Sequence, residues 1–95
     1  MTEFVAECMW PDVHETDLQA LDQRAAEQAE SSAAGGLPVR YVGSILMRED
    51  EVVLCIFQGE LEAVRSVAKA AEIPYERILE TARSPWASGR DQPAG

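Results

Sequence analysis

The sequence predicts an α+β fold in which a four-stranded antiparallel sheet carries two helices on one face. Three observations lead to this expectation. Short apolar runs with strand-like composition alternate with two stretches in which apolar residues recur at helical spacing. Glycine, proline or a charged turn separates each run from the next. The resulting order is strand, helix, strand, strand, helix, strand, within a single domain of 95 residues.

The first strand and the first helix are expected in the first third of the chain. Glu3–Met9 is a short run with alternating apolar residues, as in a strand. Thr16 followed by Gln19 is a capping-box pattern, which predicts that a helix begins there. The pair Gly35-Gly36 ends this helix after about Ser32. Its apolar stripe, at helical spacing, consists of Leu18, Leu21, Ala25 and Ala29.

The remaining elements follow the same logic. Residues 39–48 and 52–58 are rich in β-branched and apolar residues and are joined by a charged turn, so they are expected to form a hairpin. Gly59 ends the hairpin, and a second amphipathic helix follows until Pro74 stops it. Arg77–Thr81 is the last strand.

This βαββαβ order is the ferredoxin-like arrangement, with the domain covering residues 1–83. Right-handed crossovers place the first strand beside the third in the centre of the sheet. Residues 84–95 are rich in proline, glycine, serine and charge, and are expected to form a mobile tail that only Trp86 could anchor.

The sheet face away from the helices predicts a homodimer. A sheet covered on one side should alternate apolar with polar residues, but the third strand is apolar on both faces. Covering by a second copy explains this pattern best, and covering by the tail is the competing explanation. The two faces of the third strand are Val52, Leu54 and Ile56, and Val53, Cys55 and Phe57.

The composition excludes several classes of partner. Eight basic and 17 acidic residues give a net charge of −9, which repels nucleic-acid phosphates and anionic membrane surfaces and attracts cations. Apolar runs are far shorter than the roughly 18 residues of a membrane span. The start of the chain lacks the pattern of a secretory signal, so the cytoplasm is the expected location.

The chain's single histidine lies in an acidic turn before the first helix. His14, Asp12 and Glu15 offer one imidazole and two carboxylates, which suits an open, partly hydrated site for Ni(II), Mn(II) or Co(II). A helix N-terminus repels cations, however, and Thr16 and Asp17 are needed for capping. The alternative is a solvated helix start with an exposed histidine.

Glu7 is the second candidate group. A carboxylate in a central strand, on a face that a second copy would cover, is costly unless it is paired. It could serve as a general acid or base in a cavity between two sheets, or it could pair with Arg40, Arg77 or a basic residue of the other copy. The cavity would bind a small organic molecule and would be lined by Glu7, Met9, Tyr41, Cys55 and Phe57.

Other chemistries find no support in the sequence. Cys8 and Cys55 are expected to point to opposite faces of the sheet, so neither a disulfide nor a shared metal site is expected. Two separated cysteines cannot hold an iron–sulfur cluster. A glycine-rich phosphate loop is missing between strand and helix, which excludes that kind of nucleotide binding.

Three segments resemble a known family. They are EFVAECMWPDVHETDL, VRYVGSILMREDEVVLCIFQG and AAEIPYERILE, which together span most of residues 3–83. In these segments the chain resembles the small bacterial nickel-binding proteins of ferredoxin-like fold, formerly a domain of unknown function. The resemblance implies a homodimer that binds Ni(II) at surface sites and sequesters surplus metal. The residues of this chain that match what a nickel site needs are His14, Asp12 and Glu15, and the hypothesis gives them the role of metal ligands.

The sequence therefore leaves three hypotheses open. The first is a non-catalytic homodimer that binds nickel. The second is a small-molecule binder or enzyme that uses the cavity between the sheets, with Glu7 as acid or base. The third is a purely structural or regulatory dimer, which predicts neither a metal nor an organic ligand.

Overall fold

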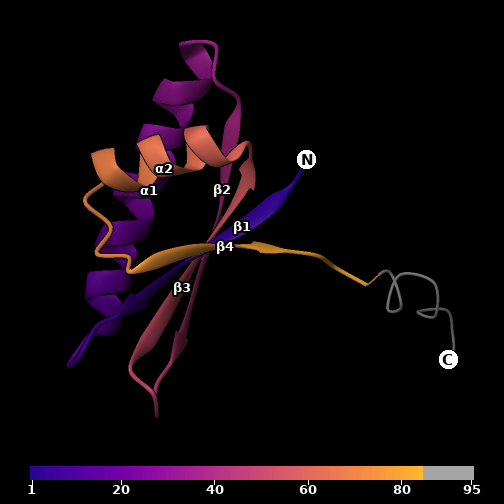
Figure 1. Ribbon diagram of the computed structural model, residues 1–95. Coiled ribbons are helices and arrows are strands. Elements are labelled where there is room, and N and C mark those ends of the chain that lie inside the picture. The colour runs from indigo at the N-terminus through magenta and orange to yellow at the C-terminus, as the bar shows by residue number, and fades with distance from the viewer. Residues whose placement is uncertain (85–95) are drawn as a thin grey trace, which may run out of the picture.

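The computed structural model describes residues 1–84 and has the predicted order of elements (Figure 1). Each strand and the second helix lie within a residue or two of where the sequence places them. The expected tail, apart from Ser84, lies outside the described residues. The elements are β1 (Glu3–Met9), α1 (Glu15–Ala34), β2 (Val39–Met47), β3 (Val52–Gly59), α2 (Leu61–Ala70) and β4 (Arg77–Thr81).

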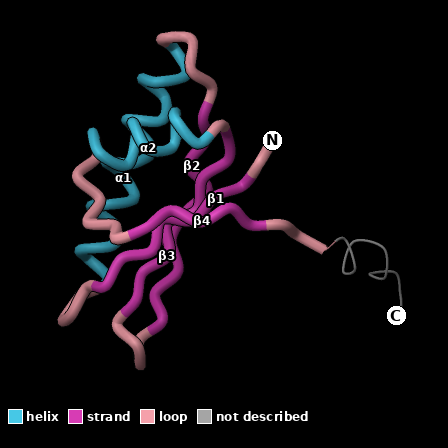
Figure 2. The backbone as a smooth tube through the Cα atoms, viewed as in Figure 1, coloured by secondary structure: helices cyan, strands magenta, loops and turns pink. Residues whose placement is uncertain are grey.

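The four strands form one antiparallel sheet in the order β2-β3-β1-β4. The expected central position of β1 beside β3 is thus confirmed. Both helices lie on the same side of this sheet, as the tube view shows (Figure 2). The fold is therefore ferredoxin-like, with one sheet face covered by helices and the other left uncovered by residues 1–84. We call this second surface the open face.

The core lies between the helices and the sheet. Directly paired residues of neighbouring strands point to the same face, so Phe4 with Phe57 and Ala6 with Cys55 both face the helices. Small side chains of α1 let the helix approach the sheet closely. The fully buried core comprises Ala6, Cys8, Leu21, Ala25, Val53, Cys55, Phe57, Val64 and Ala68.

Helix α1 begins earlier than the capping-box pattern predicts. His14 is the N-cap residue, and its backbone N–H donates to the carboxylate of Asp17 at 2.8 Å. Thr16 lies inside the first turn. The stop is where the sequence predicts it, because Gly36 takes a positive φ of 98° and the N–H of Leu37 donates to the carbonyl of Ser32.

Strand β2 carries an irregularity that decides which side chains face the helices. Val42 is an extra residue between Tyr41, which pairs with Phe57, and Gly43, which pairs with Ile56. This β-bulge shifts the alternation by one position.

Among residues 1–84, neither helix has the length and apolar character to cross a membrane.

Candidate functional site

The open face presents apolar side chains that residues 1–84 leave uncovered. Its side chains come from all four strands. The register aligns Ile45, Leu54, Glu7 and Arg77 in one row, and Ile56, Val5 and Leu79 in the next. Several of these residues are strongly exposed for their type. The exposed apolar residues on this face are Met9 (51%), Ile45 (49%), Met47 (40%) and Leu79 (37%).

Glu7 lies on the open face and is paired within the same chain. The Nε of Arg77, directly opposite on β4, donates to Glu7 Oε1 at 2.6 Å. The side chain of Glu7 is 28% exposed and that of Arg77 is 63% exposed. The hydrogen bond and the charge of Glu7 raise the pKa of Arg77. Of the two possibilities for Glu7, the structure contains the ion pair with Arg77.

The predicted cavity lining is wrong in part, because its residues lie on two different faces. Glu7 and Met9 are on the open face. Cys55 and Phe57 are buried against the helices, and the ring of Tyr41 contacts that of Phe57 edge to face, with centroids 5.1 Å apart. Cross-strand pairing with the core side of β1 fixes this orientation, so the five residues cannot line one cavity.

Tyr41, one of the predicted cavity residues, instead belongs to a polar cluster on the helix side of the sheet. The hydroxyl of Tyr41 donates to Asp22 Oδ1 at 2.5 Å, and Ser44 Oγ donates to the same oxygen at 2.8 Å. Burial, together with the bond to Asp22, raises the pKa of Tyr41 well above its ordinary range. The cluster ties α1 to the edge strand β2. Asp22 falls four residues after Leu18 and so lies on the same side of α1. A carboxylate at helical spacing from the apolar stripe is the pattern by which the sequence could have indicated this cluster.

The two cysteines are on the same face, contrary to the expectation that they point apart. Cys8 pairs with Val53 and Cys55 with Ala6, so both thiols are buried under the helices as free cysteines. The hydrogen bond with Cys55 lowers the pKa of Cys8 despite burial. The contact with Cys8, together with burial, raises the pKa of Cys55.

The histidine turn is held by contacts to the hairpin tip. Asp12, at a positive φ of 62°, has its backbone N–H bonded to Glu51 Oε2 at 3.1 Å. Glu15 forms an ion pair with Arg48, and His14 is exposed. Within residues 1–84, no three His, Cys, Asp or Glu side chains gather closely enough to hold a metal ion. The predicted ligands are thus neighbours along the chain without being a preformed site.

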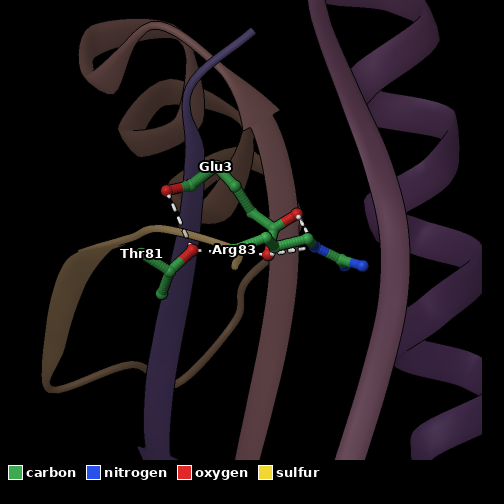
Figure 3. Close-up of polar contacts among 3 residues, drawn as sticks. All are labelled: Glu3, Thr81 and Arg83. Atoms are coloured by element: carbon green, nitrogen blue, oxygen red, sulfur yellow. Dashed lines mark hydrogen bonds and ion pairs between the residues drawn. The ribbon is translucent and has the colours of Figure 1, made fainter. Parts of the chain in front are cut away.

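A hollow of about 580 Å³ lies at one end of the open face. Glu3 stands in it, and its carboxylate accepts hydrogen bonds from Arg83 Nε at 3.1 Å and from Thr81 Oγ1 at 3.3 Å (Figure 3). We call this site the polar hollow, and the sequence did not point to it. Its lining comprises Met1, Thr2, Glu3, Arg40, Val42, Gln58, Glu80, Thr81, Ala82 and Arg83.

Comparison with known proteins supports the fold. No protein-family model matches the sequence, and no curated protein matches it. Among solved structures, the chain is similar to SCO4226 from Streptomyces coelicolor A3(2), known from a crystal structure analysis, with a TM-score of 0.70. The match covers 86% of this chain and 98% of that chain at 18% sequence identity. A likeness at this identity identifies the ferredoxin-like fold that the two proteins share.

Proposed function

We propose that this protein is a homodimer in which the open faces of two sheets pack together. The observation that carries the proposal is the row of exposed apolar side chains across the open face, among them Met9, Ile45 and Leu79. Water-exposed apolar surface of this extent favours association, and a second copy presents a surface of the same shape and chemistry. In such a dimer the Glu7–Arg77 pair enters the interface already neutralised.

The dimer is proposed to bind a ligand without catalysis. A catalytic role on the open face would use Glu7 as acid or base, but Arg77 holds that carboxylate. This ion pair favours a binding protein over the enzyme alternative. We propose the cytoplasm as its location. Cys8 and Cys55 are both free thiols, and cysteines stay reduced in the cytoplasm.

Nickel is the proposed cargo. The net charge of −9 attracts divalent cations, and the β1–α1 turn carries His14 and Asp12, with the backbone N–H of Asp12 bonded to Glu51 of the hairpin tip. An imidazole with carboxylate oxygens suits Ni(II). A complete coordination shell would require Glu15 to leave Arg48, or ligands from the second copy.

Calorimetric titration of the full chain with Ni(II) tests this cargo. We expect His14→Ala and Glu15→Gln to weaken binding. Glu62→Gln is the matched control, because Glu62 is also an exposed acid that pairs with an arginine, in α2 and away from the turn. Heats that survive both substitutions would exclude the turn, and the absence of heats with the unmodified chain would exclude the nickel role.

Light scattering over a range of protein concentrations tests the dimer independently of metal. The chain has a mass of 10.4 kDa, and we expect twice that mass at micromolar concentration. A single-chain mass at the highest concentrations would contradict the pairing of the open faces, whatever the result with nickel.

A further inference from the structure

The polar hollow is built by a row of side chains that crosses all four strands. In register, Arg40 of β2 pairs with Gln58 of β3, Gln58 with Glu3 of β1, and Glu3 with Thr81 of β4. This row lies at one end of the open face, and the apolar residues Val42 and Met1 line the hollow beside it. The volume of the polar hollow, about 580 Å³, falls in the range of pockets that hold small organic ligands.

Arg40 stands out because its guanidinium is unused in a strongly acidic chain. The other arginines of residues 1–84 each donate to an oxygen: Arg24 to Ala71, Arg48 to Glu15, Arg65 to Glu62, Arg77 to Glu7 and Arg83 to Glu3. Among the arginines of residues 1–84, Arg40 alone forms neither an ion pair nor a side-chain hydrogen bond. The side-chain amide of its cross-strand neighbour Gln58 is likewise unpaired within residues 1–84.

The charges around Arg40 leave room for one negative charge. Glu3 is neutralised by Arg83 and accepts from Thr81, so it does not compete for the Arg40 guanidinium. Glu80 lines the far side of the polar hollow, and Glu30 shares a smaller hollow with Arg40 on the helix side. Neither carboxylate forms an ion pair with Arg40, and Glu80, which lines the polar hollow, opposes a ligand with a second negative charge.

We propose that the polar hollow is a binding site for a small organic monocarboxylate. The planar fork of Arg40 donates to the two carboxylate oxygens, and the amide of Gln58 supplies a further N–H. The apolar part of the ligand lies against Val42 and Met1. The net charge of −9 disfavours a phosphate dianion. The side chains of this site all come from one chain, so binding does not require nickel, and because the hollow lies at one end of the open face a second copy would lie beside the ligand.

Titration of the full chain with 3-phenylpropionate, followed by amide chemical shifts, tests the proposal. We expect the shifts to centre on residues 40, 58 and 81. The neutral isostere 3-phenylpropanamide should bind at least about tenfold more weakly, because a charge-assisted bond is lost. Arg40→Gln should weaken carboxylate binding by a similar factor. Arg65→Gln, which removes the same charge from α2, should leave it unchanged.

Several results would overturn the proposal. They are the absence of localised shifts at millimolar 3-phenylpropionate, equal binding of the amide, or equal binding by the Arg40→Gln variant. Tighter binding of inorganic phosphate would reject the carboxylate class. Sedimentation of Arg40→Gln gives a separate readout, because a shift from dimer to monomer without any carboxylate binding would assign Arg40 to the subunit interface instead.

Discussion

Truncation of Ile45 should weaken the dimer without unfolding the chain. Ile45 lies in the middle row of the open face and is 49% exposed in the single chain. Burying a whole isoleucine side chain is worth about 1.5–3 kcal/mol, so the exposed half is worth about 0.7–1.5 kcal/mol per chain. A two-fold dimer counts the residue twice, which gives about 1.5–3 kcal/mol. Ile45→Ala should therefore raise the dimer dissociation constant about 10- to 100-fold.

Sedimentation equilibrium measures this constant directly. Leu37→Ala is the control, because Leu37 is 54% exposed but lies in the loop between α1 and β2, away from the open face. We expect the control to dimerise like the unmodified chain. An unchanged constant for Ile45→Ala, or an equal loss for Leu37→Ala, would refute the assignment of the open face as the interface. Ile45→Asp should abolish dimerisation, because two unpaired carboxylates would enter an apolar contact.

Two further predictions concern the fold that supports the open face. The pKa of Tyr41 is raised in the folded chain, so above about pH 10 the unfolded chain loses the tyrosine proton while the folded chain keeps it. The free energy of unfolding should therefore fall as pH rises, by up to about 1.4 kcal/mol per pH unit. Denaturant unfolding from pH 9.5 to 11.5 should show a steeper fall for the unmodified chain than for Tyr41→Phe, and equal slopes would contradict a raised pKa of Tyr41 from its half-buried bond to Asp22. Gly59→Ala should lower the melting temperature, because Gly59 has a φ of 151° and a Cβ would lie 2.9 Å from the carbonyl oxygen of Pro38. Gly35→Ala, at an ordinary φ of −84°, should leave it nearly unchanged, so a similar loss in both would rule out the close approach at Gly59.

Much of the fold follows from local patterns in the sequence. The alternation in β1 places Phe4, Ala6 and Cys8 toward the helices, and helical spacing identifies Leu21 and Ala25 as core residues of α1. These patterns can be read locally because each strand or helix must bury one of its sides, regardless of which other element covers that side. The order β2-β3-β1-β4 then follows from the handedness of the crossovers.

The sites were harder to predict because they depend on contacts between distant residues. Both faces of β3 are apolar, so only its pairing with β1 shows that Cys55 and Phe57 belong to the core. The bulge at Val42 reverses the alternation in β2, so that Tyr41 and Ser44 share one face and reach Asp22 together.

One feature was misplaced and one was missed because each depends on contacts that the local pattern does not show. The capping-box pattern at Thr16 is common, but the bond between Asp17 and the His14 backbone starts α1 before it. The polar hollow joins residues from both ends of the described chain, which local patterns do not connect.

Intermolecular methyl contacts give the most direct test of the central claim that two open faces pack together. In a sample mixed from differently isotope-labelled chains, isotope-filtered NOE spectra report only contacts between copies. We expect such contacts among the methyl groups of Ile45, Leu54, Ile56 and Leu79. Intermolecular contacts confined to the helices, or a complete absence of them at concentrations where the chain is dimeric, would contradict the account.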